Sequence, residues 1–310
     1  MKKLITVVAA SVCAVSFSAT AFAEAPATDN KANAEAMEKE ETDWFSAGFD
    51  ADLFSAYVFR NAIFNDELVI QPCVWVDLTL FDFLTVGGNV WQNWNLTDRW
   101  KQDGIPQEMN ESDYDVHVGA NIWESDDEEY SLYLQLAHDW FTYRYDLESD
   151  YEIQLRMEFN NPFVGVYGQY SHCYAPSSAC LFEVGLKQDW TVGEIVESEN
   201  DYLNRLTVGF DWNMSFGSGR FFSKYLWGPV QGAYDPATGE YGEENIENGI
   251  GGTTIKGMLG YRVCDHFTIG ALLAFTSALS SSVRDSVEYM GHGESYKDLV
   301  WGGLQVKLDF

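Results

Sequence analysis

The sequence lacks a long apolar run. After the N-terminal segment, no apolar stretch reaches the roughly 20 residues that a membrane-spanning helix needs, and the mean hydropathy is −0.21. These properties exclude a bundle of transmembrane helices. They do not exclude a membrane β-barrel, because alternate residues of a barrel strand face the lumen and keep its mean hydropathy unremarkable. Periodicity therefore decides the class of protein.

Basic residues are also scarce. The 310 residues include 18 Lys and Arg against 48 Asp and Glu, so the formal net charge is −30. Such a charge repels the phosphates of nucleic acid. The sequence also has no glycine-rich phosphate loop, no Cys/His spacing typical of zinc and no ordered carboxylate spacing typical of a calcium loop. We therefore expect no nucleic-acid partner, no cofactor and no metal site.

The first 23 residues have the organisation of a secretory signal. Lys2 and Lys3 precede an apolar stretch, and alanines flank Phe22 at the expected cleavage point. Residues 24–43 are rich in Ala, Glu and Lys, which predicts a flexible acidic leader. The expected organisation is a cleaved signal peptide over 1–23, a leader over 24–43 and one folded domain over 44–310.

Four cysteines follow the signal segment. Cys173 and Cys180 bracket a short polar loop, and export into an oxidising compartment allows a disulfide between them. Two unpaired thiols at the ends of that loop are the alternative. Cys73 and Cys264 lie within or beside predicted strands, where we expect a structural role.

A period of two residues runs through most of the remaining chain. In residues 113–122 the polar and apolar side chains alternate, and residues 151–159 repeat the pattern with Ile, Leu and Met against Glu, Gln and Arg. Such strands have one apolar face and one polar face. A soluble β-sandwich has the same alternation, so the period alone does not identify the architecture.

Strand length and connection length favour a membrane barrel. The alternation persists for about 10 to 14 residues, whereas strands of soluble sheets have mostly about 5 to 6 and tilted membrane strands need about 9 to 11. Connections after odd-numbered strands are long and those after even-numbered strands are short, except 192–203, as expected for external loops and periplasmic turns. The predicted strands are 45–60, 68–81, 83–96, 112–124, 129–143, 151–160, 163–174, 181–191, 204–214, 252–263, 267–279 and 296–310.

Aromatic residues gather at the ends of these strands. Tyr151 and Phe159 bound one predicted lipid face, and Tyr296 and Phe310 bound another, as in the aromatic girdles of membrane barrels. The last strand alternates up to the terminal Phe310. This ending resembles the assembly signal of outer-membrane proteins in general, and the resemblance implies that Phe310 docks with the barrel-assembly machinery.

A second resemblance lies near the start of the predicted barrel. The segment SAYVFRNAIFNDELVIQPCVWV, residues 55–76, is followed by Val90-Trp91 and by Asn-Leu-Thr-Asp at 95–98. It is similar to the TorF-type porins, which share an opening strand ending Ser-x-Tyr-Val-Phe-Arg. That motif usually continues with Gly, whereas this chain has Asn61. The resemblance covers about the first three strands and implies a barrel more than any particular solute.

The polar face of the predicted strands supplies candidate lumen residues, and an acidic excess there favours cations in a water-filled channel. In a plugged barrel the same charges would only pair across the interior. About twelve strands permit a narrow pore without requiring one. The predicted pore-lining residues are Asp50, Asp52, Asp77, Asp113, Asp115, His117, Asp139, Glu152, Glu158, Glu183, Asp189, Asp211, Arg60, Arg156, Lys187, Arg205, Lys256, Arg262 and Lys297.

One long connection, 215–251, is rich in glycine and acidic residues. It either folds inward as a constriction or stands in solvent as a charged surface loop. It also leaves the strand number uncertain by two, because a further hairpin could lie around 221–230.

A hydrolytic site is a third hypothesis. Asp113, Asp115 and His117 share the predicted lumen face, with Asp139 on the next strand, and such a group near the outer rim could activate water. A cation-attracting vestibule with an incidental histidine is the alternative. Ser131 and His138 have opposite parity, which excludes a lipid-side Ser/His pair.

The sequence therefore predicts an all-β protein, a single antiparallel barrel in the outer membrane of a Gram-negative bacterium. The expected function is non-enzymatic: passive, porin-like diffusion of small hydrophilic solutes or cations, with lipid and lipopolysaccharide as surroundings. A plugged structural or surface-interaction barrel is the alternative, and the outer-rim hydrolase follows at a distance. The pattern marks no oligomer interface.

Overall fold

The structure is a computed structural model. It describes residues 44–81, 83–97, 111–126, 129–143, 149–175, 178–223, 230–235, 240–244, 246–289 and 296–310. The predicted signal peptide and leader lie outside the described residues.

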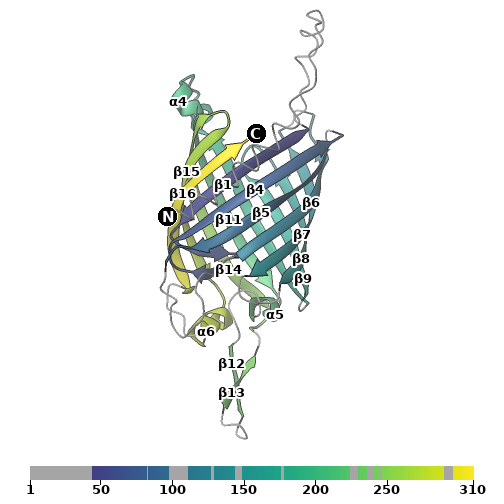
Figure 1. Cartoon of the computed structure of the whole chain (residues 1–310), viewed down its shortest axis with the longest axis vertical. Helices are drawn as coiled ribbons and strands as arrows, with labels where there is room; N and C mark the ends of the chain where they lie inside the picture. Colours follow the sequence, from purple (N-terminus) through teal and green to yellow (C-terminus); the bar gives the residue numbers. More distant parts are fainter. Residues whose placement is uncertain are drawn as a thin grey trace, which may run out of the picture. The chain divides into compact units, whose positions relative to one another are not determined.

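Among the described residues, twelve antiparallel strands close into one barrel (Figure 1). β1 completes the closure, because it pairs with β4 on one side and with β16 on the other. The predicted fold class is thereby confirmed. The barrel strands are β1 (Phe45–Phe54), β4 (Val69–Leu80), β5 (Leu84–Asn95), β6 (Glu111–Glu124), β7 (Ser131–Tyr143), β8 (Asp150–Asn160), β9 (Gly165–Ala175), β10 (Ala179–Thr191), β11 (Leu206–Gly217), β14 (Gly249–Cys264), β15 (Phe267–Ala278) and β16 (Asp298–Asp309).

The predicted strand positions differ from these bounds by a few residues, with one larger exception. The first strand, predicted over 45–60, ends at Phe54. The register explains the early ending, because Phe54 pairs with Val69 at the start of β4. Residues 55–68 therefore leave the barrel wall between two strands that are already side by side.

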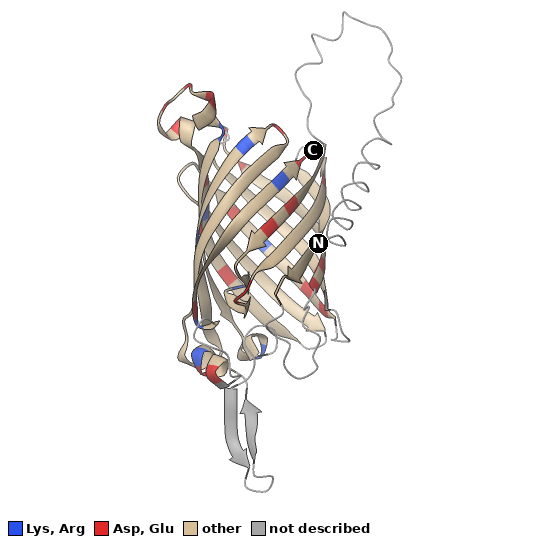
Figure 2. Ribbon diagram, turned by 60° about the vertical axis from the view of Figure 1, so that its left-hand side comes forward, with Lys and Arg blue, Asp and Glu red and all other residues tan. Residues whose placement is uncertain are grey.

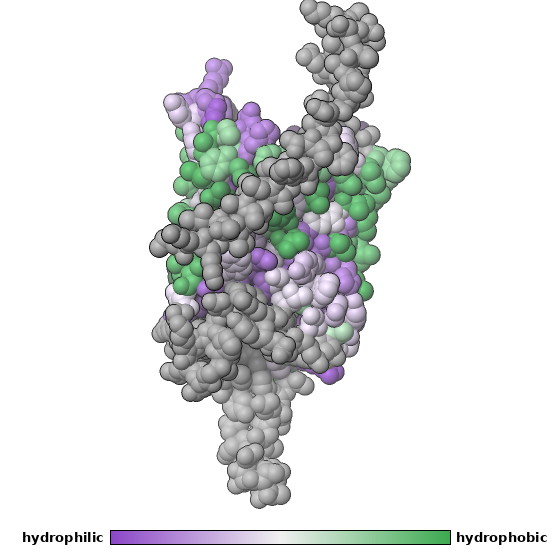
Figure 3. All heavy atoms as spheres, viewed as in Figure 1, coloured by the Kyte–Doolittle hydropathy of each residue, from purple (hydrophilic) through white to green (hydrophobic). Residues whose placement is uncertain are grey.

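The outer face of the barrel is apolar. On β8, Ile153, Leu155 and Met157 are 43%, 46% and 51% exposed, while Glu152, which precedes Ile153 and faces the lumen, is fully buried. A water-soluble protein has the opposite arrangement. Figure 3 shows hydrophobic residues along the flanks of the barrel and hydrophilic residues near the end that carries α4. An exposed apolar band of this extent fits contact with lipid.

The two ends of the barrel differ. At one end, called the turn end, β4–β5, β6–β7, β8–β9 and β14–β15 are joined by short connections, and the C-terminus lies there (Figure 1). The connection 192–203, which the sequence predicts to be the one long connection at this end, contains α3 (Val192–Ile195) and α4 (Asp201–Asn204). At the opposite end, called the loop end, lie α5 (Gly219–Phe221) and α6 (Ser281–Tyr289). No helix of the described chain is long and apolar enough to cross a membrane.

The long connection between β11 and β14 contains a hairpin of β12 (Val230–Asp235) and β13 (Glu240–Glu244). These two strands form a separate sheet and pair only with each other. They add nothing to the barrel, so the number of barrel strands stays at the predicted value.

Aromatic side chains mark both ends of the outer face. Near the loop end the ring centroids of Tyr114 and Trp140 are 5.5 Å apart, and Tyr151 stacks on Trp140 at 6.0 Å. At the turn end Phe81 and Phe163 are largely exposed. The prediction for Tyr296 is wrong, because this residue precedes β16 and is buried in an apolar cluster.

Candidate functional site

The chain between β1 and β4 folds back into the barrel. Residues 55–68 contain β2 (Tyr57–Phe59) and β3 (Ala62–Asn65), which pair with each other and with no barrel strand. We call residues 55–68 the inner hairpin. The sequence predicts a wall strand up to residue 60 and an external loop over 61–67, and the structure shows that both predictions are wrong. Tyr57, Ala62 and Ile63 are almost fully buried.

The turn of the inner hairpin has an unusual backbone. Arg60 and Asn61 have φ angles of 50° and 68°, as the two central residues of a type I′ turn require. Asn tolerates this left-handed conformation, whereas Arg seldom adopts it. The side-chain contacts of Arg60 account for its presence here.

Arg60 forms a buried ion pair with the barrel wall. Its guanidinium donates two hydrogen bonds to Glu152 on β8, one of them at 2.6 Å from Nη1 to Oε2. Glu183 on β10 lies 3.9 Å from Arg60 Nε. The Cys173 thiol on β9 donates to Glu152 at 3.2 Å. The two parallel donors fix the guanidinium in direction as well as in position.

The inner hairpin meets the wall at further points. The Tyr57 hydroxyl donates to Glu111 Oε2 on β6 at 2.6 Å, and the rings of Phe59 and Phe141 on β7 are 6.0 Å apart. On the opposite side of the barrel, a Cβ built on Gly252 would lie 2.9 Å from the Cβ of Asn61. The hairpin therefore crosses the lumen from β6–β8 to β14.

Apolar packing holds the inner hairpin from two sides. One buried cluster joins it to α5 and α6, and the other joins it to β1, β4, β15 and β16. The first contains Ala62, Ile63, Cys173, Ala179, Leu181, Phe221, Phe222, Ile246, Ala278, Val283, Val287 and Tyr296. The second contains Phe54, Ala56, Tyr57, Val69, Leu272, Ala274 and Trp301. The loop half of the lumen is therefore packed much like a protein core.

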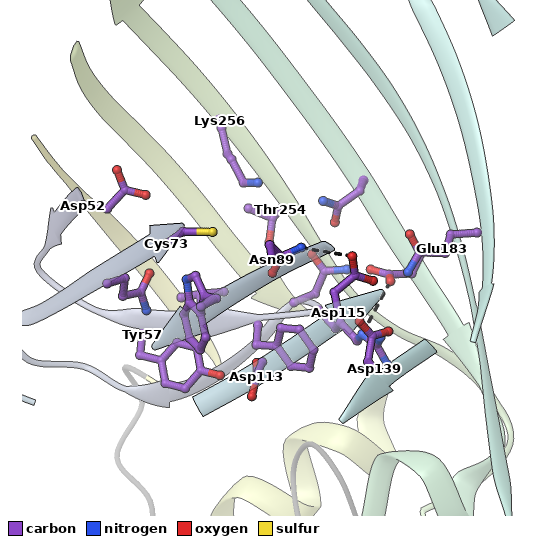
Figure 4. Close-up of a pocket in the computed structure, with 18 of the residues that line it drawn as sticks. Asp52, Tyr57, Cys73, Asn89, Asp113, Asp115, Asp139, Glu183, Thr254 and Lys256 are labelled. Carbon is purple, nitrogen blue, oxygen red and sulfur yellow. Dashed lines mark hydrogen bonds and ion pairs between the residues drawn. The ribbon is translucent and has the colours of Figure 1, made fainter. Parts of the chain in front are cut away.

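A cavity of about 800 Å³ lies in the lumen alongside the inner hairpin. Figure 4 shows its labelled side chains, with Asp115 and Asp139 close together and Lys256 apart from them. The lining includes residues of the hairpin, among them Tyr57, Arg60 and Asn61, and residues of most barrel strands. A space of this size, lined by polar and apolar side chains together, has room for many water molecules.

The charges around the cavity are segregated. On β8, β10, β11 and β14 the bases are paired: Glu158 contacts both Arg156 and Lys187 at 2.5 Å, and Lys256 contacts Asp211 at 3.0 Å. On β1, β6 and β7, three of the cavity acids accept hydrogen bonds from side-chain amides. Asp52 accepts from Gln305, Asp115 from Asn89, and Asp139 from Gln154. Figure 2 shows this spread of acidic and basic positions over different strands.

The predicted pore-lining residues divide into three groups. Those that line the cavity are Asp52, Arg60, Asp113, Asp115, His117, Asp139, Arg156, Glu158, Glu183 and Lys256. Those on the same strand faces as the cavity residues but not lining it are Asp50, Asp77, Glu152, Lys187, Asp189, Asp211 and Arg262. Arg205 and Lys297 lie outside the barrel strands.

The prediction that Arg205 and Lys297 line the pore is wrong. Arg205 precedes β11 at the turn end, where its guanidinium contacts Asp201 and the carbonyl oxygen of Val263. Lys297 precedes β16 at the loop end and pairs with Glu288 of α6. Both residues were placed by extending a strand past its true start, because alternation continues by chance into the adjoining turn.

The predicted disulfide is absent. Cys173 and Cys180 are both free thiols. In the register of β9 and β10, Cys173 pairs with Ala179, and Cys180 pairs with His172. Cys173 therefore points into the lumen and Cys180 points outward, because neighbouring positions on a strand face opposite sides of the sheet. Two thiols on opposite faces cannot meet without moving the backbone.

His117 lies between two carboxylates. Its Nδ1 is 2.6 Å from Asp115 Oδ1, and its Nε2 is 3.0 Å from Asp77 Oδ1 on β4. Gly87 on the intervening β5 makes this bridge possible, because a Cβ there would lie 1.8 Å from Asp77 Oδ1. Both ring nitrogens are therefore engaged by the wall. This arrangement fits a structural bridge better than the base of the predicted hydrolase.

No group of three or more His, Cys, Asp or Glu in the described chain is arranged to hold a metal ion.

The long connection 215–251 was predicted to fold inward as a constriction or to stand in solvent, and part of it lies outside the described residues. Phe221 and Phe222 of its α5 region pack on the inner hairpin, whereas β12 and β13 form a separate sheet.

Sequence reasoning missed the inner hairpin, although a signal was present. From Tyr57 to Phe64 the apolar residues occupy both parities of the strand, with Val58 beside Phe59 and Ile63 beside Phe64. A wall strand of a barrel alternates, whereas a segment buried on both faces does not. This loss of alternation after Phe54 indicates an internal segment.

Comparisons with known proteins give similarity of fold. No protein-family model and no curated protein sequence matches the chain. A KdgM porin structure is 9% identical over 86% of this chain and 99% of that chain, with a TM-score of 0.42. The COG4313 outer-membrane channel of Pseudomonas putida F1 is 9% identical over 86% and 95%, with a TM-score of 0.49. Outer membrane phospholipase A of Escherichia coli is 10% identical over 84% and 89%, with a TM-score of 0.43. The resemblance to TorF-type porins stays a prediction.

Proposed function

We propose that the chain is an outer-membrane channel for passive diffusion of small hydrophilic solutes, with a preference for cations. The observation that carries the proposal is the cavity of about 800 Å³ in the lumen, whose wall includes acidic side chains. Asp52, Asp115 and Asp139 on that wall accept hydrogen bonds from side-chain amides, and none of them forms an ion pair with Lys or Arg in the described chain. Fixed acidic charge along a narrow water-filled path concentrates cations and repels anions.

The outer face supports placement in a membrane. Apolar side chains such as Leu155, Leu259 and Val300 are about half exposed along the middle of the strands, where a lipid environment would cover them. The terminal Phe310 leaves its ring exposed and stacks on His266, which suits its proposed role as an assembly signal. Outer-membrane lipid, lipopolysaccharide and the assembly machinery are the proposed surroundings, reached through a cleaved signal peptide.

Conductance tests this proposal directly. The refolded protein is inserted into a planar bilayer, and the reversal potential is recorded under a salt gradient. We expect discrete current steps and a reversal potential of the sign that marks cation preference. A protein that is folded, as judged by its β-type circular dichroism, but carries no current at any voltage would reject the channel.

A second function is a closed barrel with a structural or surface-interaction role. The observation that favours it is the inner hairpin, which crosses the lumen and packs against α5 and α6. The two functions differ in one property. A channel requires a path past the hairpin, whereas a closed barrel requires that the hairpin never leaves.

A further inference from the structure

We infer that the inner hairpin is a displaceable plug and that the ion pair of Arg60 with Glu152 is its latch. The inference rests on the proposed function for its conductance readout, but not for its second readout, thiol accessibility. Four features of the hairpin lead to it: its attachment, its turn, its buried amide without a partner and the space beside it.

The first feature is attachment. The inner hairpin shares no strand ladder with the barrel wall, so it can move without breaking the closed sheet. Its stem is held by backbone bonds from Ser55 N to Gly302 O at 2.9 Å and from Leu96 N to Leu68 O at 3.0 Å. Beyond the stem, its polar contacts with the wall are made by side chains, chiefly Tyr57 and Arg60. The barrel is therefore complete with the hairpin in or out.

The second feature is the strained turn. Arg60 takes a left-handed backbone conformation with φ of 50°, which is unfavourable for a residue with a long side chain. Such strain persists only where the surroundings hold it. Here the surroundings are the carboxylates of Glu152 and Glu183 and the rings of Phe59 and Phe221, which lie 4.7 and 5.6 Å from the guanidinium carbon. The latch therefore holds a conformation that the turn alone would not favour.

The third feature, the buried amide of Asn61, destabilises the docked position of the hairpin. Asn61 is 3% exposed, and neither its Nδ2 nor its Oδ1 finds a partner among the described residues. A buried amide without partners is unfavourable relative to one in water. Leaving the docked position would hydrate it. The same residue thus shapes the turn and weakens the docked state.

The fourth feature is room to move, set against the packing that resists movement. The lumen cavity of about 800 Å³ lies alongside the hairpin, so displacement needs no rearrangement of the wall. However, Tyr57, Ala62 and Ile63 lie in apolar clusters that would open. We therefore expect the plug to be docked most of the time and the channel to open in brief events.

Arg60→Gln tests the latch. It leaves Glu152 without its cation in a buried site, which disfavours the docked state strongly. We expect the ratio of open to closed time in bilayer recordings to rise by at least roughly tenfold. Arg60→Lys keeps the charge but loses the paired donors, so its effect should be smaller. Arg205→Gln is the matched control, since Arg205 is also ion-paired but lies at the turn end.

Asn61→Gly provides a test in the opposite direction. Glycine adopts the left-handed backbone at this position freely and removes the buried amide. We expect the open fraction to fall relative to the unmodified protein. If Arg60→Gln and Asn61→Gly changed the open fraction in the same direction, the latch model would be wrong.

Thiol labelling measures docking without any current. Cys173 is 2% exposed and touches Glu152 beneath the latch. In a variant of the protein without residues 1–23, with Cys73, Cys180 and Cys264 changed to Ser, we expect a small cationic methanethiosulfonate to label Cys173 slowly, and roughly tenfold faster after Arg60→Gln. Circular dichroism confirms that each variant is folded.

The two readouts separate the possible failures. If no variant conducts but Arg60→Gln still exposes Cys173, the hairpin moves and the proposed channel is rejected. If the unmodified protein conducts and Arg60→Gln changes neither open time nor labelling, the hairpin is a fixed part of the wall. In that case solutes pass beside it and the plug is rejected.

Discussion

The loop half and the turn half of the lumen are filled by different means. In the loop half, the inner hairpin supplies the bulk, and its Ile63 packs in one cluster with Phe221 of α5. In the turn half, long side chains of the wall extend over glycines of the neighbouring strand. Tyr133 lies over Gly119, and Tyr167 over Gly185, in each case where a Cβ would be closer than 2.5 Å to the ring.

The comparison shows what alternation does and does not determine. One pattern of apolar and polar residues builds the wall in both halves, because it fixes which side chains face inward. It does not determine what occupies the space they face. A returned hairpin can leave as a unit, whereas side chains anchored along the wall cannot. The loop half is therefore the place for a movable element, and the turn half is the place for a fixed one.

The largest expected effect comes from removing the hairpin. Phe54 and Val69 are paired neighbours, so a two-residue Asn-Gly type I′ turn can replace residues 55–68. We expect single-channel conductance to rise several-fold, because the loop half loses its filling. Replacing β12–β13, residues 230–244, by a short linker is the control and should leave conductance unchanged, since those strands form a separate sheet and pair with no barrel strand. An unchanged conductance without the inner hairpin would mean that the turn half alone limits flow.

The turn half should respond in stability. Gly87→Ala places a Cβ 1.8 Å from Asp77 Oδ1 and 2.6 Å from the backbone oxygen of Val76, so the bridge from His117 to Asp77 must break. We expect a loss of about 1–3 kcal/mol in the free energy of unfolding, measured by urea titration in lipid vesicles. The control is Gly257→Ala, whose Cβ would meet only Leu273 O at 3.9 Å. Equal effects of the two substitutions would show that the bridge contributes nothing.

These two halves also differ in how far the sequence predicts them. The wall is predictable, because a period of two and strand length together specify a closed barrel, and the strand positions agree within a few residues. The acidic wall follows from the same parity, as for Asp52, Asp115 and Asp139. The inner hairpin was not predicted, because its burial depends on contacts between Arg60 and Glu152, 92 residues apart.

The prediction of a disulfide is wrong for a related reason. Spacing in the sequence placed Cys173 and Cys180 at the ends of one short loop, but the register between β9 and β10 decides which faces they take. Register depends on the turn geometry, which the spacing alone leaves open. The face that a residue takes within one strand was therefore predicted more accurately than a contact between residues of two strands.

The charged side chains that line the cavity should set the preference of the channel for cations or anions. Asp115→Asn removes one carboxylate that has no Lys or Arg partner on the described cavity wall, and we expect the ratio of cation to anion permeability to fall about twofold. Lys256→Gln removes the opposing cation and should raise that ratio. Both are measured as reversal potentials under a salt gradient, with Asp201→Asn at the turn end as the charge-matched control for Asp115→Asn. Identical reversal potentials for all four proteins would place the selective charge elsewhere.

The smallest expected effect is on stability, through the ion pair between Glu288 of α6 and Lys297 at the loop end. Hydrogen bonding to Lys297 lowers the pKa of the Glu288 carboxyl on α6. A lowered pKa stabilises the folded state above the ordinary glutamate pKa of about 4.3, and that stabilisation is lost as the pH falls through the lowered value. Glu288→Gln should therefore be slightly less stable than the unmodified protein at pH 7 and equal to it in strong acid. Because Glu288 is largely exposed, solvent screening keeps the difference small. Glu199→Gln, which removes the same charge at the turn end, controls for net charge in urea titrations at both pH values. A difference that persisted in acid would assign the effect to packing of α6 and not to the ion pair.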